Sequence, residues 1–244
     1  MHSRDRLEKA FVLHRRCYSN TSLLLEIFSS AHGRFPAIAK GAKRGRAPTA
    51  VLLQPFTPLW LSWSGRGEVR TLARVEAAGG SMTLAGKGLY CGFYLNELVM
   101  RLLGRNDPQE DLFAFYHAAL TRLAQGTDLD GPLRQFELRL LQDAGYALDL
   151  EREWDTRQPV VAHGRYVYEP ERGVRAAGVD EGGLVCGETL LALAAGEPLT
   201  GALAREARGL MRSALAPYLG PRPLRSRELF LQGTEALGSR PVRE

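Results

Sequence analysis

The feature that most constrains the fold is a series of short β-prone segments that occupies the first 80 residues. These segments are rich in aliphatic and aromatic residues, and turns containing Gly, Ser or Pro separate them. Leu23, Leu25 and Ile27 recur at every second position, which is the period of a strand with one buried face. We therefore predict five strands, at residues 10–14, 22–28, 35–39, 59–63 and 68–75.

Five short strands in a small domain are typical of a closed Greek-key barrel of the OB type, which binds single-stranded nucleic acid on one sheet face and its bordering loops. Pro55 and Pro58 precede the fourth strand, so we expect its start to lie at a sheet edge. Arg70 and Arg74 are four residues apart in the fifth strand, so strict alternation places them on the same face. Seven aromatic residues are candidates either for the barrel core or for base stacking: Phe11, Tyr18, Phe28, Phe35, Phe56, Trp60 and Trp63.

In the rest of the chain, the apolar pattern predicts mainly helices. We expect them at 87–103, from a start within 106–110 to Gly126, at 132–145, at 187–195 and from Thr200 to about Leu215, with a hairpin around 166–175. The first helix is apolar on nearly every side, so Asn96 and Glu97 are expected to be structural anchors with partners. The expected fold class is α+β, with an N-terminal five-stranded OB-fold β barrel followed by a mainly α-helical domain and a small C-terminal irregular or hairpin part. The expected segments are 1–80 (OB-fold nucleic-acid-binding domain), 81–150 (helical domain), 151–190 (small hairpin region) and 191–244 (C-terminal helices packing on the helical domain).

Positive charge is concentrated in the first domain. Residues 1–80 contain 13 Lys and Arg against 5 Asp and Glu, whereas the rest of the chain contains 19 against 22. Four cations fall within the seven residues from Lys40 to Arg46, between two predicted strands. A basic loop of this kind can lie along a phosphate backbone and release its counterions, although such loops are also common as solvated surface. Arg66, Arg70 and Arg74 add cations near the fifth strand.

Several functional classes lack their sequence signatures. The chain has no phosphate-binding Gly-rich loop, no dinucleotide fingerprint and no His-Glu-x-x-His helix. No apolar run is long enough to span a membrane, and no secretory signal follows Met1. Three distant cysteines, Cys17, Cys91 and Cys186, indicate neither a disulfide framework nor a paired-cysteine zinc site, so we expect a reducing, cytoplasmic compartment.

We therefore expect a non-catalytic binding protein. One alternative is an OB-fold protein that binds or processes RNA. A less favoured alternative is a Mg²⁺-dependent nuclease that uses Asp128 and Asp130.

The sequence resembles the bacterial recombination-mediator family RecO over nearly its whole length and in the same order. The resemblance is carried by residues 11–14, 21–23, 39–43, 53–59, 65–69, 89–98, 134–138, 145–146, 217–220 and 224–230.

This resemblance implies an N-terminal OB domain and a central helical domain. It also implies binding to single- and double-stranded DNA, annealing of complementary strands and binding to the C-terminal tail of the single-stranded-DNA-binding protein SSB. With RecR, such proteins help to load RecA on SSB-coated DNA, in a bacterial cytoplasm and near the nucleoid, with no membrane involvement. Many members carry a four-cysteine zinc site within residues 150–190. Only Cys186 occurs there in this chain, so no cofactor, and no zinc in particular, is expected.

The resemblance and the charge pattern together select candidate binding residues. For DNA they are Lys40, Lys43, Arg44, Arg46, Arg15, Arg34, Arg66, Arg70 and Arg74. For the SSB tail, the positions that match the family pocket are Arg134 and, with weaker flanking similarity, Arg205. An arginine fork suits a terminal carboxylate, and Leu138 and Leu141 are expected to line an apolar groove beside it.

Overall fold

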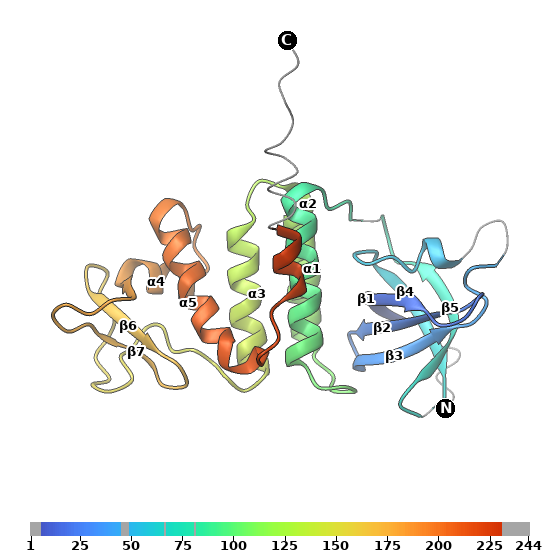
Figure 1. The fold of residues 1–244 in the computed structure, drawn as a ribbon, viewed down its shortest axis with the longest axis horizontal. Coiled ribbons are helices and arrows are strands. Elements are labelled where there is room, and N and C mark those ends of the chain that lie inside the picture. The colour runs from blue at the N-terminus through green and yellow to red at the C-terminus, as the bar shows by residue number, and fades with distance from the viewer. Residues whose placement is uncertain (1–5, 45–48, 66, 81, 231–244) are drawn as a thin grey trace, which may run out of the picture. The chain divides into compact units, whose positions relative to one another are not determined.

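The N-terminal part of the chain folds into a closed barrel (Figure 1). The computed structural model describes residues 6–44, 49–65, 67–80 and 82–230. The barrel strands are β1 (Glu8–Cys17), β2 (Leu23–Ser29), β3 (Gly33–Ala39), β4 (Leu59–Ser64) and β5 (Arg70–Ala77). They are hydrogen-bonded in the order β1-β2-β3-β5-β4, and β4 closes the barrel against β1. The expected five-stranded barrel is confirmed, and each predicted strand coincides with an observed one to within a few residues.

The barrel core contains the residues that the alternating pattern selected. Leu23, Leu25 and Ile27 are all buried and pack with Phe35 and Trp63. Burying each such side chain contributes about 1.5–3 kcal/mol, so the inward face of the strands fixes their register.

The prediction that β4 starts at a sheet edge is wrong. Leu59 pairs with Ala10 of β1 on one side and with Ala77 of β5 on the other. Pro58 is tolerated because it lies just before the strand, and its carbonyl still accepts a hydrogen bond from the Ala78 amide at 2.9 Å.

The alternation in β5 is interrupted, so Arg70 and Arg74 do not share a face. Ser62 pairs with Arg74 and Trp63 with Leu72, which leaves Ala73 as an extra residue in β5. On the N-terminal side of this bulge, the Arg70 guanidinium lies over the buried Phe35 ring. On its C-terminal side, Arg74 is exposed.

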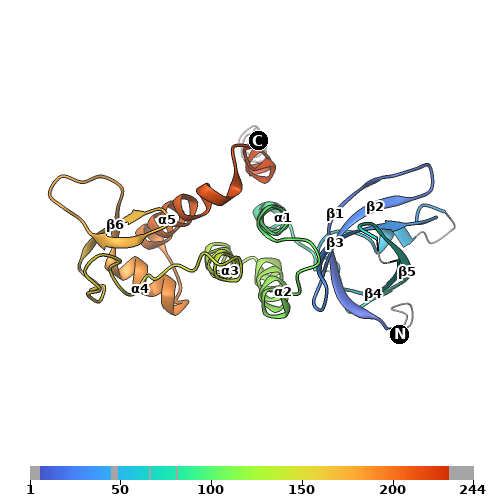
Figure 2. The ribbon, with the colours of Figure 1, turned by 90° about the horizontal axis from the view of Figure 1, so that it is seen from below.

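Two helices belong to the same compact unit as the barrel, namely α1 (Gly86–Leu102) and α2 (Glu110–Gln125) (Figure 2). Phe11 and Phe28 of the barrel are buried against Phe113 and Tyr116 of α2, with ring centroids 5.1–5.7 Å apart. These two aromatic residues therefore join the barrel to its helices.

Asn96 and Glu97 of α1 are structural anchors, as predicted. The Asn96 amide donates to the Leu13 carbonyl at 2.8 Å, and its side-chain oxygen accepts from the Tyr116 hydroxyl at 2.6 Å. Glu97 accepts hydrogen bonds from the backbone amides of Arg225 and Ser226 at 3.0 and 2.9 Å, and from the Ser226 hydroxyl at 2.8 Å. Glu97 thereby holds the segment that begins at Leu224 in the same unit as α1 (Figure 1).

The second compact unit comprises residues 127–223. It contains α3 (Asp130–Asp143), a three-stranded sheet ordered β7-β6-β8, α4 (Gly187–Ala195) and α5 (Gly201–Leu219). The predicted hairpin is formed by β6 (Arg165–Glu169) and β7 (Gly173–Ala176), and β8 (Leu184–Cys186) adds to β6. Arg175 pairs with Glu169 at 2.7 Å and with Glu181 at 2.8 Å, which ties the hairpin to the following loop.

This grouping differs from the four expected segments because α1 and α2 belong with the barrel, whereas α3 belongs with the hairpin and the later helices. The start of α2 at Glu110 falls at the end of the predicted range 106–110. One helix boundary differs from the prediction, because α5 continues through Pro217 to Leu219, beyond the expected end at about Leu215. In the described part of the chain, no helix is both long and apolar enough to cross a membrane.

Candidate nucleic-acid interface

The basic loop after β3 is fastened to the neighbouring β1–β2 turn. The Lys43 backbone amide donates to the Thr21 carbonyl at 3.1 Å, and its ammonium donates to the Ser19 carbonyl at 3.2 Å. The Arg15 guanidinium of β1 donates to the Ala50 carbonyl at 2.9 Å, in the short helix η1 (Thr49–Val51) that follows the loop. Three segments of the barrel therefore hold this cluster of cations in one place.

The cations of this region lack carboxylate partners. Lys40, Arg44 and Arg74 are exposed. In the described ranges, no Asp or Glu lies within ion-pair distance of these three residues, of Lys43 or of Arg15. A cation whose charge is not neutralised within the protein is available to a phosphate, and each phosphate it neutralises releases a counterion.

A shallow hollow of about 140 Å³ lies between the basic loop and β5. It is lined by Ala39, Lys40, Ala42, Thr49, Leu72, Ala73 and Val75. β3 and β5 pair in parallel at Ala37–Arg70 and Ile38–Thr71, and the hollow opens beyond these pairs. Lys40 lies on one side of the hollow, and β5, the strand that carries exposed Arg74, forms the other side.

Two predicted DNA contacts are engaged within the protein. The Arg34 guanidinium pairs with Glu26 and donates to the Leu103 carbonyl at 2.9 and 3.2 Å. The Arg70 guanidinium lies 3.9 Å from the centroid of the Phe35 ring and donates to Asn106 at 2.6 Å. Burial lowers the pKa of Arg70, although the Glu8 carboxylate opposes this shift. Arg34 and Arg70 therefore stabilise the compact unit that contains the barrel, α1 and α2. Arg46 and Arg66, also predicted, lie outside the described residues.

The structure also separates the aromatic candidates. Phe11, Phe28, Phe35, Phe56 and Trp63 are buried. Trp60 is partly covered, with the Lys9 ammonium 5.6 Å from its ring centroid. Tyr18 is 61% exposed and adjoins Ser19, whose carbonyl accepts from Lys43. The sequence did not distinguish among the seven aromatic residues, and it did not indicate exposed Arg16 on β1. Strand alternation does not reveal the exposure of Tyr18 or of Arg16.

The sequence is similar to those of known proteins over most of its length. The family model described as "Recombination protein O N terminal" matches residues 1–80, and "Recombination protein O C terminal" matches residues 85–228. The chain belongs to the RecO family. The DNA repair protein RecO of Methylococcus capsulatus is 49% identical, over 93% of this chain and 94% of that protein. The DNA repair proteins RecO of Nitrosococcus oceani and Nitrosospira multiformis are 47% and 45% identical, over 92–93% of this chain and 92–95% of theirs.

A RecO family member is a protein of DNA repair and recombination, so the resemblance inferred from sequence is confirmed at the level of family. The two family segments meet between residues 80 and 85, which lie between β5 and α1.

The residues expected to hold an SSB tail all lie in the second unit, but they differ in exposure. Arg205 is exposed on α5. Arg134 is 5% exposed and pairs with the fully buried Glu137 at 2.9 Å. Leu138 is half-buried, whereas Leu141 is fully buried in the core and does not line a surface groove. The buried position of Leu141 on α3 is incompatible with the exposed role expected of it.

The two acids considered for a nuclease have structural partners. The Asp128 carboxylate accepts from the Gly131 amide at 3.0 Å at the start of α3. Asp130 pairs with Arg208 of α5 at 3.1 Å. Within the described residues, no group of three or more His, Cys, Asp or Glu side chains is placed to hold a metal ion. The geometry of these acids therefore gives the nuclease hypothesis no support.

Proposed function

We propose that this RecO family protein is a non-catalytic DNA-binding recombination mediator. It binds single- and double-stranded DNA on the barrel, anneals complementary strands and, together with RecR, helps to load RecA on SSB-coated DNA. The observation that carries the proposal is a set of cations that have no carboxylate partner among the described residues. Lys40, which lines the hollow, Lys43 and Arg44 lie in the basic loop, Arg15 on β1 is bonded to the segment after the loop, and exposed Arg74 lies on β5.

The chemistry of annealing fits such a surface. Two complementary strands repel each other through their phosphates, and bound cations reduce this repulsion. Base pairing then provides the driving force, so no bond needs to be broken by the protein. Tyr18 offers a ring on which an unpaired base can stack beside Lys43, and such stacking contributes about 1–3 kcal/mol per base.

The second unit has a proposed role in recognising the SSB tail. Arg205 offers an exposed guanidinium to a terminal carboxylate. Arg134 would take part only by exchanging its contact with Glu137, because these two side chains pair at 2.9 Å. We therefore place Arg205 first and Arg134 second as contacts for the tail.

The proposal is tested by annealing of two complementary labelled oligonucleotides in buffer with EDTA and no nucleotide, with and without SSB. We expect the protein to accelerate annealing in both cases and to leave both strands intact on a denaturing gel. In a separate assay that contains Mg²⁺ and ATP, the protein together with RecR should increase RecA assembly on SSB-coated strands. Failure to accelerate annealing, or cleavage of a strand after Mg²⁺ is added, would contradict the proposal. Equal affinity for matched DNA and RNA strands would favour an RNA-binding role instead.

A further inference from the structure

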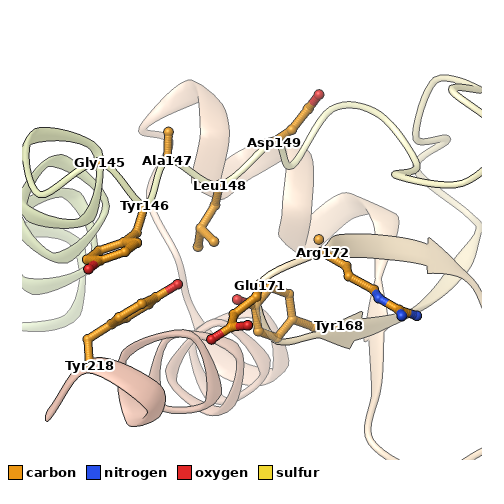
Figure 3. Close-up of a pocket in the computed structure, with 10 residues that line it drawn as sticks. Gly145, Tyr146, Ala147, Leu148, Asp149, Tyr168, Glu171, Arg172 and Tyr218 are labelled. Carbon is orange, nitrogen blue, oxygen red and sulfur yellow. The ribbon is translucent and has the colours of Figure 1, made fainter.

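A second cavity lies in the other unit and has different chemistry from the barrel surface. It has a volume of about 340 Å³, which is within the range of small-ligand sites. Its lining includes three tyrosines, Tyr146, Tyr168 and Tyr218, which come from the segment just after α3, from β6 and from the end of α5 (Figure 3). Nothing in the proposed DNA-binding role uses this cavity.

The tyrosines form the aromatic walls of the cavity. The rings of Tyr146 and Tyr218 stack, with centroids 3.7 Å apart and planes 20° apart. Tyr146 is nevertheless 44% exposed, so part of this stacked pair is accessible to a ligand. Tyr168 lies across from the pair, as Figure 3 shows. Aromatic faces arranged in this way attract cations through the ring quadrupole.

The charged groups of the cavity have a negative balance. Glu171 lies between Tyr218 and Tyr168, and it has no ion-pair partner among the described residues (Figure 3). Burial, and next the Glu171 carboxylate, raise the pKa of Tyr218, so the field of this carboxylate reaches the aromatic wall. Asp149 also belongs to the lining, but its carboxylate accepts from the backbone amides of Glu151 and Arg152 at 3.1 and 3.0 Å and points away from the tyrosines in Figure 3, so Glu171 is the carboxylate that faces them.

Arg172 is the one cation in the lining, and it is directed elsewhere. Its guanidinium donates to Glu169 at 3.4 Å and lies 5.0 Å from the centroid of the Trp154 ring. Figure 3 shows it pointing away from the tyrosines. A phosphate beside the tyrosines would therefore meet the Glu171 carboxylate with no cation of the lining directed toward it, which disfavours a nucleotide as the ligand.

We propose that this cavity is a docking site for a basic side chain, foremost an arginine, of a protein partner. The guanidinium plane would stack on the tyrosine rings while Glu171 accepts its hydrogen bonds. Planar stacking combined with paired hydrogen bonds favours arginine over lysine. Tyrosine and arginine are also the residue types that concentrate binding energy at protein interfaces.

The test uses the full chain labelled with 3-fluorotyrosine and followed by ¹⁹F NMR. Three probes are titrated: a blocked Gly-Arg-Gly peptide, the same peptide with neutral citrulline, and thymidine monophosphate. We expect the arginine peptide to shift the resonances of Tyr146, Tyr168 and Tyr218, which are assigned by single Tyr→Phe substitutions. The citrulline peptide and the nucleotide should leave these resonances unchanged.

Single substitutions then test separately the contribution of the Tyr218 ring and that of the Glu171 charge to binding of the arginine peptide. Tyr218→Leu removes one ring and should weaken binding of the arginine peptide about tenfold, whereas Tyr218→Phe keeps the ring and should bind nearly normally. Glu171→Gln, at an exposed position, should weaken binding about threefold, and Glu151→Gln outside the cavity should have no effect. Unchanged thermal unfolding and DNA affinity show that each variant is folded. Equal binding of the citrulline peptide, binding of the nucleotide instead, or no shift with any probe overturns the proposal.

Discussion

At the scale of single residues, cations that look alike in the sequence have two different roles. Arg34, Arg101, Arg139 and Arg208 each pair with a carboxylate of the protein. Lys40, Lys43, Arg44 and Arg74 lack such partners in the described ranges. Sequence reasoning could find the basic loop by composition. It could not distinguish Arg34 and Arg70 from the exposed cations. The Leu103 carbonyl and the Asn106 side chain, which accept their hydrogen bonds, come from the segment between α1 and α2, far away in the sequence.

Tyr18 provides a test at this scale. We predict that Tyr18→Ala weakens binding of single-stranded DNA about fivefold or more, because one base loses its stacking surface. Affinity for duplex DNA, whose bases are already stacked, should change by less than about twofold by the same argument. Fluorescence anisotropy with matched oligonucleotides measures both values. Tyr18→Phe serves as control and should keep wild-type affinity. Equal weakening for single and double strands would show that Tyr18 does not stack on a base.

At the scale of elements, local patterns predicted the structure wherever burial follows a simple period. Leu23, Leu25 and Ile27 set the inward face of β2, and Gly126 ends α2 in the left-handed conformation that glycine favours. The patterns failed where tertiary pairing dominates. The extra residue Ala73 in β5 is set by pairing with β4, and β4 is enclosed on both sides although a proline precedes it.

The Glu97 carboxylate of α1, which holds the segment at Arg225 and Ser226, should make the stability of the fold depend on pH. Burial alone would raise its pKa, but hydrogen bonds from Ser226 and Arg225, with the charge of Arg101, lower it below the ordinary value of 4.5. A lowered folded-state pKa means that the ionised carboxylate stabilises the fold above pH 4.5, and that this contribution is lost as pH falls through the lowered pKa.

We predict that Glu97→Gln lowers the free energy of unfolding at pH 7 by about 1–3 kcal/mol. It should also reduce the loss of stability on acidification, because glutamine has no proton to gain. Urea unfolding of both proteins between pH 7 and pH 3 measures these effects. Glu76→Gln, at an exposed position of β5, is the control and should change stability at pH 7 by less than about 0.5 kcal/mol. A wild type and a Glu97→Gln variant with parallel pH profiles would contradict the role of Glu97.

At the scale of the whole molecule, we propose that DNA binds to the barrel of the first unit and the SSB tail to the second unit. These two activities should therefore be separable by mutation. We predict that Arg205→Ala lowers affinity for an SSB-tail peptide about threefold or more and leaves binding of naked DNA unchanged. Calorimetry with the peptide and anisotropy with DNA measure the two affinities.

Arg152→Ala, another exposed arginine of the second unit, is the control for this separation. Arg134→Ala should also lower peptide affinity, but it removes the guanidinium that contacts the buried Glu137 carboxylate at 2.9 Å and should lower stability by about 3–5 kcal/mol. Unchanged peptide binding in Arg205→Ala would remove that residue from the tail site.

We propose that the basic loop of the barrel binds DNA through the phosphates of the DNA. The most direct measurement is the affinity for single-stranded DNA as a function of salt, for wild type and for Lys43→Glu combined with Arg44→Glu. The control, Arg152→Glu combined with Arg157→Glu, makes the same change of charge on exposed residues of the second unit. We predict that the loop variant binds at least about tenfold more weakly at moderate salt, with a slope of log affinity against log salt reduced by about 1.4 for two lost phosphate contacts. The control should bind like wild type; unchanged affinity and slope in the loop variant, or equal weakening in the control, would contradict the account.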